Sequence, residues 1–421
     1  MRPARPNRRY EAALWLDKRV GPLLCTLLLG VRRLLRRAPP VRDTPISKIL
    51  VLKFWGMGSI VLASPLLVAL RERHPEARID FATLEENDAL LRLVPYVDRR
   101  ITLGLGKGIP RFLLDTLRLI LRVRRERYDL LLDLEFFTRY TAIFSFLANA
   151  RITRGFSAKG SARGQLHDVE VPFNAYHHVA TNFLTLLEAN PLRVIPARPG
   201  DEQVVLPALA AGEAARARCD AALASQPGYR TGRPTVVINP NTGDMALERR
   251  WPPELMAELL RELARSEDVN LVLTGSSGER PFVESVVRLA GIEGRGVVAA
   301  GKLDLEAFIA LLERAHVVVT NDSGPLHLAR AAGAPVVALF GPETPVLYGP
   351  LRSRDVQPFR VHYRGLACSP CMFVHDNKVL SCWFAQARCM TEIEPREVLA
   401  SVRELLEAGH AAAARRVAAR P

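Results

Sequence analysis

Apolar residues along this chain occur in short runs separated by amphipathic stretches. The runs are rich in Val, Ile and Leu, which is typical of parallel strands buried on both faces. They occupy residues 48–53, 78–83, 99–103, 129–134 and 151–155, and then residues 235–239, 270–274, 296–300, 316–320 and 335–340. The stretches between them have helical periodicity, for example at residues 253–265 and 305–314.

This regular alternation of strand and helix predicts an α/β fold with parallel sheets covered on both faces. Because the alternation occurs in two series, we expect two Rossmann-like domains that face a central cleft. Ligands of open α/β sheets bind at the carboxyl ends of the strands. We therefore look for functional residues directly after the apolar runs.

The first 46 residues have a different pattern. Residues 20–31 are apolar and are followed by Arg32-Arg33-Leu34-Leu35-Arg36-Arg37. The apolar run is shorter than the about 20 residues that span a bilayer, and arginines stand where a signal peptide would need small residues. We predict a basic amphipathic helix that lies on anionic head groups at the inner face of the plasma membrane. The alternative is a solvated or core-packed helix with a basic tail.

The pattern also suggests domain limits. We expect a basic amphipathic N-terminal extension at residues 1–46 and a first Rossmann-like domain at residues 47–195. A second Rossmann-like domain would occupy residues 196–405, and residues 406–421 would form a C-terminal tail. The boundary lies near residues 191–200, where the chain is rich in proline and poor in pattern.

The net charge of +14 raises the possibility of a nucleic-acid partner. Residues 1–48 contain twelve Lys and Arg against three acidic residues, so they carry most of that charge. The remaining chain has an ordinary charge balance, and the basic segment has few aromatic residues to stack on bases. We therefore expect no nucleic-acid partner.

The segment Asn321-Asp322-Ser323-Gly324-Pro325-Leu326-His327 follows an apolar run and leads into a helical pattern. A strand that turns at once into a helix presents free backbone N–H groups and the positive end of the helix dipole, which together bind anions. Gly324 allows a ligand to approach the backbone. We predict a pyrophosphate site here. The alternative is a helix start that Asp322 and Ser323 merely cap.

The loop after the first apolar run reads Lys53-Phe54-Trp55-Gly56-Met57-Gly58-Ser59. Together with residues 321–345, it resembles glycosyltransferase family 9, which includes the ADP-heptose:lipopolysaccharide heptosyltransferases. The resemblance covers roughly residues 47–405. It implies a GT-B fold in which the first domain binds the acceptor and the second binds a nucleotide sugar.

The resemblance also implies roles for individual residues of the second domain. Asp322, Ser323, Gly324 and His327 match the donor site of the family. In Arg249-Arg250-Trp251-Pro252, Arg249 stands where the family has a lysine, and its charge would stabilise the departing diphosphate. A solvated arginine at a helix end is the alternative for Arg249.

Two further donor contacts have weaker signals. Thr242 lies in a polar turn after a predicted strand and is a candidate phosphate ligand. Glu279 follows Gly275-Ser276-Ser277-Gly278 and is a candidate ribose ligand. Glu279 is equally a favourable first-turn residue because of the helix dipole.

The family usually has an aspartate as general base where this chain has Ser59. A serine hydroxyl does not accept the proton at neutral pH without a base of its own. Glu135 is our candidate substitute, because it follows an apolar run and would face the same cleft. Asp133 competes with it, and an ion pair between Glu135 and Arg139 at i,i+4 is the structural alternative.

The chain contains no Asp-x-Asp motif, so we expect no metal on the diphosphate and no cofactor beyond the nucleotide sugar, which the resemblance implies is ADP-linked. Four cysteines have C-x2-C-x10-C-x6-C spacing, which is compatible with a zinc knuckle or with reduced structural thiols. They are Cys368, Cys371, Cys382 and Cys389.

These observations predict an inverting glycosyltransferase on the cytoplasmic face of the inner membrane. It would move a sugar, heptose by family resemblance, from an ADP-sugar to a lipopolysaccharide-core or other lipid-linked saccharide acceptor. The alternative is a nucleotide-sugar-binding protein without catalysis, which the serine at position 59 suggests.

Overall fold

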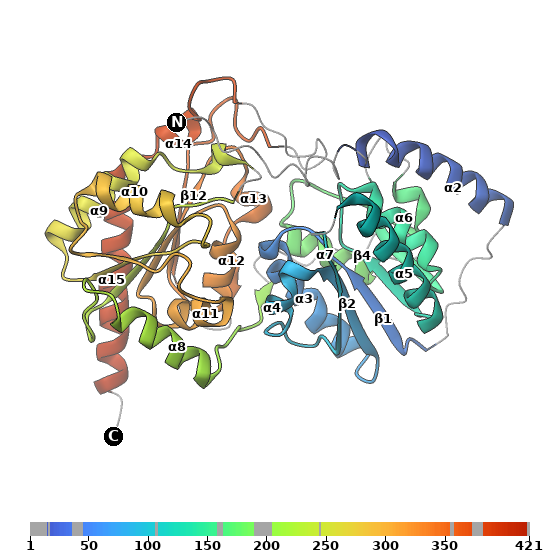
Figure 1. The fold of residues 1–421 in the computed structure, drawn as a ribbon, viewed down its shortest axis with the longest axis horizontal. Helices are drawn as coiled ribbons and strands as arrows, with labels where there is room; N and C mark the ends of the chain where they lie inside the picture. The colour runs from blue at the N-terminus through green and yellow to red at the C-terminus, as the bar shows by residue number, and fades with distance from the viewer. Residues whose placement is uncertain are drawn as a thin grey trace. The chain divides into compact units, whose positions relative to one another are not determined.

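The structure, a computed structural model, describes residues 15, 17–35, 45–105, 108–157, 163–188, 204–243, 246–353, 358–372 and 382–418. These residues form two compact units, one with the described residues up to Val204 and one that begins at Val205 (Figure 1). The predicted boundary at residues 195 and 196 lies outside the described residues.

Unit 1 contains a six-stranded sheet in which every neighbouring pair is parallel. In sheet order its strands are β3 (Arg99–Leu103), β2 (Arg78–Leu84), β1 (Lys48–Leu52), β4 (Leu130–Asp133), β5 (Ile152–Ser157) and β6 (Val169–Pro172). Its helices are α2 (Gly21–Leu35), α3 (Met57–Arg73), α4 (Asp88–Leu91), α5 (Ile109–Glu126), α6 (Arg139–Ala148) and α7 (Val179–Glu188).

The helices of unit 1 divide between the two faces of its sheet. Strands β2 and β3 follow β1 on one side of the sheet, and β4, the next strand in the chain, lies on the other side of β1. Right-handed crossovers therefore place α5 and α6 on the face opposite α3. In agreement, α3 packs against α7 whereas α5 packs against α6. The inner strands β1 and β4 are almost wholly buried, which explains their continuous hydrophobicity.

Unit 2 repeats this arrangement with its own parallel sheet. In order, its strands are β10 (Gly296–Val298), β9 (Asn270–Leu273), β8 (Thr235–Asn239), β11 (Val317–Asn321), β12 (Val336–Phe340) and β14 (Phe359–Tyr363). Its helices are α8 (Glu213–Ala224), α9 (Pro253–Ser266), α10 (Arg280–Ala290), α11 (Leu305–Arg314), α12 (Gly324–Ala331), α13 (Pro345–Tyr348), α14 (Arg388–Thr391) and α15 (Pro395–Ala418). Two short strands, β7 (Val205–Leu206) and β13 (Arg352–Ser353), pair separately.

The predicted α/β fold with two Rossmann-like domains is confirmed. Two edge strands, β6 and β14, were not predicted. β6 has only four residues and alternates between buried and exposed positions, and every residue of β14 is only partly buried. Neither strand therefore has the continuous apolar run by which inner parallel strands are predicted. The predicted limit between residues 405 and 406 falls within α15.

In the described part of the N-terminal extension, residues 21–35 form helix α2, which packs on α6. Cys25, Leu28 and Leu29 of α2 contribute to a small apolar cluster with Ala142 and Leu166. The carboxylate of Asp17 accepts hydrogen bonds of 2.8 Å from the first two N–H groups of α6. Among the described residues, none of the helices is long and apolar enough to cross a membrane.

Candidate active site

The donor-side residues of unit 2 gather where β8 and β11 end. The two strands are paired in parallel, with Thr320 opposite Asn239, so their carboxyl ends meet at one edge of the sheet. Asn321 ties the following loops together: its Nδ2 donates to the carbonyl oxygen of Pro240 at 3.0 Å, and its Oδ1 accepts from the Trp251 N–H at 3.0 Å. This edge is therefore held rigidly by a buried side chain.

Helix α12 begins directly after β11 and presents unused donors. Ser323 is its N-cap, in extended backbone, and makes no side-chain cap bond. Its hydroxyl lies 3.2 Å from the Asn321 carbonyl oxygen. The backbone N–H groups of Ser323 and Gly324 have no acceptor among the described residues. The geometry is that of an anion site, since free amides and the helix dipole point the same way.

Arg249 lies against this helix start. Its Nη1 donates to the Asp322 carbonyl oxygen at 2.8 Å, and its Nη2 donates to the Thr242 carbonyl oxygen at 3.1 Å. The Asp322 carboxylate is 3.4 Å away, and the Arg249 Nε has no hydrogen-bond partner within the described part of the chain. The buried Trp251, whose Nε1 donates to the Ile393 carbonyl oxygen, anchors the segment. Arg249 is thus a fixed cation rather than a solvated helix end.

The other predicted donor residues surround the same edge with less direct geometry. Thr242 is buried, and its hydroxyl lies 3.3 Å from the carbonyl oxygens of Gly243 and Ala246. His327 is buried in the first turn of α12. The Glu279 carboxylate accepts hydrogen bonds from the N–H and the hydroxyl of Ser276, so it closes the turn before α10. A ribose contact by Glu279 stays a prediction.

In unit 1, Glu135 lies just beyond β4 and is fully buried. Its Oε1 accepts hydrogen bonds from the N–H groups of Phe54 at 2.9 Å and Trp55 at 2.8 Å, and its Oε2 accepts one from Lys53 Nζ at 2.9 Å. Lys53 Nζ also donates to the Trp55 carbonyl oxygen at 2.7 Å. Both carboxylate oxygens therefore hold the loop between β1 and α3.

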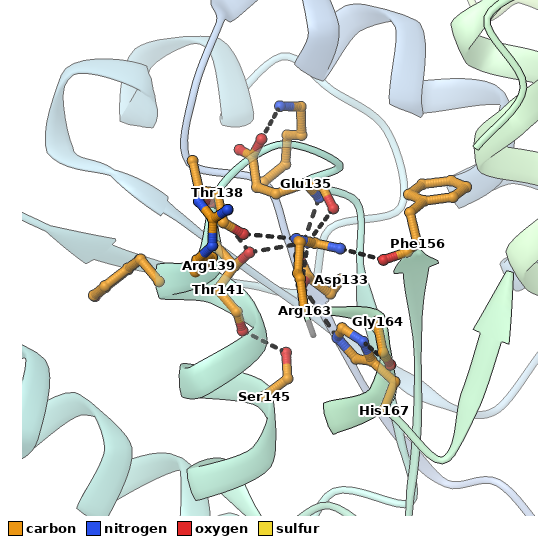
Figure 2. A network of polar contacts seen from close by, with 12 residues as sticks. Asp133, Glu135, Thr138, Arg139, Thr141, Ser145, Phe156, Arg163, Gly164 and His167 are labelled. Atoms are coloured by element: carbon orange, nitrogen blue, oxygen red, sulfur yellow. Dashed lines mark hydrogen bonds and ion pairs between the residues drawn. The ribbon is translucent and has the colours of Figure 1, made fainter. Parts of the chain in front are cut away.

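Behind Glu135, a buried guanidinium organises the loop after β4. Figure 2 shows Arg163 among the oxygen atoms of Asp133, Glu135, Thr138 and Phe156. Its Nη2 donates to Asp133 Oδ2 at 2.7 Å, and His167 Nε2 lies 3.2 Å from the same oxygen. Burial by itself would raise the pKa of Asp133, but the charge of Arg163 and the bond to His167 hold that pKa below its usual value.

These contacts bear on two alternatives that the sequence left open for this region. Asp133, the competing carboxylate, accepts a hydrogen bond from the Glu135 N–H at 3.0 Å and caps the turn after β4. The suggested ion pair between Glu135 and Arg139 is wrong, because α6 begins only at Arg139 and leaves Glu135 outside the helix. Arg139 lies instead 3.6 Å from the carboxylate of Asp17. Ser59 is partly buried in the first turn of α3.

The four spaced cysteines line one small pocket of unit 2, together with Glu248 and Trp383. All four are free thiols. Burial, and to a smaller extent the neighbouring thiols, raise the pKa of Cys389 to about 12. Within the described residues, no group of three or more His, Cys, Asp or Glu side chains is placed to hold a metal ion. The role of these thiols stays a prediction.

Sequence reasoning missed the residues that connect these segments. Lys53 is a single charged residue at the end of an apolar run. A buried lysine normally has a partner of opposite charge, so its position could have indicated such a partner. Arg163 follows no pattern that distinguishes it from the many exposed arginines of this chain. The sequence marks Asn321 only as the start of the donor motif, because its cross-strand bonds depend on the order of the strands.

Two parallel-sheet α/β units, the second with free amides where a strand leads into a helix, form the architecture of the GT-B class of glycosyltransferases. The chain belongs to glycosyltransferase family 9 (heptosyltransferase), whose family model matches residues 116–373. The protein is therefore a glycosyltransferase, as its sequence predicted.

Related heptosyltransferases align in sequence with most of this chain. Lipooligosaccharide heptosyltransferase 2 of Haemophilus influenzae is 28% identical over 309 residues, which is 73% of this chain and 86% of that protein. Lipopolysaccharide heptosyltransferase 2 of Escherichia coli is 27% identical over 309 residues, or 72% of this chain and 85% of that protein.

Solved structures show the same fold. The structure of E. coli ADP-heptose lipopolysaccharide heptosyltransferase II covers 86% of this chain and 99% of its own, with a TM-score of 0.66 at 22% identity. A family 9 glycosyltransferase from Veillonella parvula covers 88% of this chain and 99% of its own, with a TM-score of 0.67 at 22% identity. These structures establish the GT-B architecture.

Proposed function

We propose that this protein is an inverting heptosyltransferase that uses an ADP-linked heptose donor. Its acceptor would be a lipopolysaccharide-core or another lipid-linked saccharide. The family and the names of the relatives, which are heptosyltransferases of lipopolysaccharide or lipooligosaccharide, support this sugar and this acceptor. They also disfavour a binding protein without catalysis.

The observation that carries the proposal is the pairing of free amides with Arg249. In sugar transfer, negative charge builds on the diphosphate as the glycosidic bond breaks. The N–H groups of Ser323 and Gly324, which have no acceptor among the described residues, and the guanidinium of Arg249 are fixed donors for that charge. Donors fixed in advance stabilise developing charge most effectively because they need no reorganisation. Asp322, His327, Thr242 and Glu279 complete the proposed donor site.

In this proposal no metal bridges the diphosphate. Arg249 is only slightly exposed, and its hydrogen bonds go to two backbone carbonyls, while its contact with the Asp322 carboxylate is long. The Asp322 carboxylate offsets only part of its positive charge, so Arg249 can serve the role that a divalent cation has in other transferases. The reaction then needs no cofactor beyond the nucleotide sugar.

The proposed mechanism also needs a general base that removes the proton of the acceptor hydroxyl. Glu135 is the carboxylate that the sequence suggests in place of the missing aspartate at position 59. The carboxylate oxygens of Glu135, however, accept hydrogen bonds from Lys53, Phe54 and Trp55. These contacts favour a role for Glu135 in positioning the loop after β1. Glu135 could remove the acceptor proton only after this loop opens.

We also propose that the protein is peripheral to the cytoplasmic face of the inner membrane, where a lipid-linked acceptor is available. The basic N-terminal extension supports this location. Helix α2 leaves several apolar side chains exposed, among them Leu23, Leu27 and Leu34. Such a helix gains stability at an interface rather than in water.

The test is transfer of heptose from ADP-heptose to heptose-free lipopolysaccharide core by the purified protein. We expect stoichiometric release of ADP, with product of inverted anomeric configuration in its proton NMR spectrum. UDP- and GDP-sugars tested in parallel report the nucleotide preference. Tight binding of ADP-heptose without ADP release, over a panel of acceptors, would contradict the proposal.

A further inference from the structure

Helix α5 of unit 1 has an apolar stripe that the sheet does not cover. Its buried side chains, among them Ile120 and Val123, face the core. Leu113, Leu117 and Leu121 follow one another at i,i+4 spacing and are 57%, 53% and 47% exposed. With Leu114, they form a row of leucines along one flank of the helix. A row of this kind on a soluble domain marks an interaction surface.

The rim of this row is basic. Arg122, Arg125 and Arg127 are exposed and have no ion pair within the described residues. The acidic group of the same stretch, Asp115, is engaged by Arg111 and Arg118. The leucines of α5 are therefore bordered by positive charge, with no free carboxylate beside them on this helix.

Helix α2 has a second row of the same kind. Its Cys25 side faces α6, while the opposite side exposes Leu23, Leu27 and Leu34 at 72%, 64% and 84%. Arg33 is exposed near its end. Each of the two helices thus buries one side in the unit and offers leucines and arginines on another.

The two rows belong to one layer of unit 1. Helix α6 contacts both α2 and α5, and the three helices lie next to one another in Figure 1. On α6, Ile143 packs against the apolar cluster of α2 and Leu147 against the core of the unit, and both are only partly buried. We name the side chains Leu23, Leu27, Leu34, Leu113, Leu117 and Leu121 the leucine surface.

We propose that the leucine surface docks on an anionic lipid bilayer, so that the Rossmann-like domain itself, and not only the N-terminal extension, contacts lipid. The inference rests on the proposed function in one respect, which is that the acceptor is carried by lipid. Apolar side chains enter the acyl region while the surrounding arginines contact anionic head groups. A second copy of the chain is a poorer occupant, because it would bring the same unpaired arginines against this rim.

The experiment is co-sedimentation of the full-length protein with vesicles of equal parts phosphatidylcholine and phosphatidylglycerol. The α5 variant is L113Q/L117Q/L121Q, and the α2 variant is L23Q/L27Q/L34Q. L289Q, which changes a half-exposed leucine of α10 in unit 2, is the matched control. All six positions of the leucine surface are exposed, so the melting temperatures of the variants should match that of the wild type.

We expect each triple variant to bind these vesicles at least about tenfold more weakly and the control to bind as the wild type does. Binding should also weaken in 0.5 M salt and on pure phosphatidylcholine. An α5 variant with unchanged vesicle affinity overturns the inference. So does a wild-type dimer that the α5 variant converts to a monomer in light scattering, since the occupant is then a second copy.

Heptose transfer to an acceptor dispersed in detergent separates this inference from the proposed function. We expect the α5 variant to keep wild-type turnover in that assay, because no substrate contact is assigned to α5. Normal vesicle binding without any turnover by the wild type would remove the proposed function and leave lipid docking in place.

Discussion

Arg249 owes its position to backbone carbonyls. Both of its short hydrogen bonds go to the main chain of Thr242 and Asp322, and the Asp322 carboxylate is at the longer distance of 3.4 Å. Because main-chain carbonyls carry no net charge, they orient the guanidinium without neutralising it. The residue is therefore suited to receive a diphosphate.

We predict that Arg249→Ala lowers kcat for ADP-heptose by about 100-fold or more, since one charged donor to the leaving group is lost. Arg249→Lys should keep part of the rate, because the charge remains while the fork of N–H groups is lost. Steady-state kinetics on both variants measure the effect. Arg265→Ala, at an exposed position paired with Glu262, is the control and should be neutral.

A second substitution, at its partner Lys53, can show whether Glu135 acts as the general base or positions the loop after β1. Glu135→Gln alone leaves a buried ammonium without its carboxylate, so we expect a loss of about 3–5 kcal/mol in unfolding free energy. The double variant K53M/E135Q removes the buried charge and keeps an oxygen acceptor for the Phe54 and Trp55 amides. Urea unfolding should show that the double variant recovers most of this stability.

Activity of the double variant then decides between the two roles. If Glu135 positions the loop after β1, K53M/E135Q should recover most of the turnover that Glu135→Gln loses. A double variant that is stable yet still inactive, with the basic limb of its pH–rate profile altered, would assign proton removal to Glu135.

Among the elements, the end of α5 is tied to the sheet through Glu126. Its carboxylate accepts hydrogen bonds from Arg78 of β2 at 2.8 Å and from Arg99 of β3 at 2.7 Å. The hydrogen bond from Arg78, which has the larger effect, and the one from Arg99 lower the pKa of Glu126 to about 2. The helix is thereby fixed to two neighbouring strands by one charged group.

This contact should depend on pH in a defined direction. A carboxyl group with a lowered pKa in the folded state stabilises the fold above its unfolded pKa of about 4.3, and this contribution is lost as the pH falls toward 2. We predict that Glu126→Gln lowers the melting temperature at pH 7 by a few degrees and that the difference from the wild type shrinks between pH 4 and pH 2. A difference that does not vary over this range would contradict the prediction.

For the molecule as a whole, the division into two units predicts where a nucleotide acts. Each unit has its own sheet and core, and all residues proposed to hold the diphosphate belong to unit 2. ADP should therefore stabilise unit 2 by mass action, by about 2.7 kcal/mol at 100 times its dissociation constant.

Hydrogen exchange measured by mass spectrometry can locate this effect. We expect ADP to slow exchange in peptides that contain residues 239–243 and 320–331, and to leave the strands of unit 1 unchanged. The Arg249→Ala variant should show little of this protection. Protection confined to unit 1 would place the nucleotide in the other sheet and exclude the proposed donor site.

Local patterns in the chain were sufficient to predict several features of this protein. Continuous apolar runs predicted the inner strands, because strands buried on both faces have no polar positions. The turn from β11 into α12 with its free amides was predictable, since these donors arise from helix geometry. The edge strands β6 and β14 escaped prediction, because half-buried strands share their composition with loops.

Only the tertiary structure could show which distant groups meet. Lys53 and Glu135 come together because β1 and β4 are neighbours in the sheet, and Arg249 reaches Asp322 because β8 and β11 are paired. Strand order is set by packing of the whole domain and leaves no periodic trace in the chain. For the same reason, the sequence proposed Glu135 as an accessible base, and the fold surrounds its carboxylate with three donors.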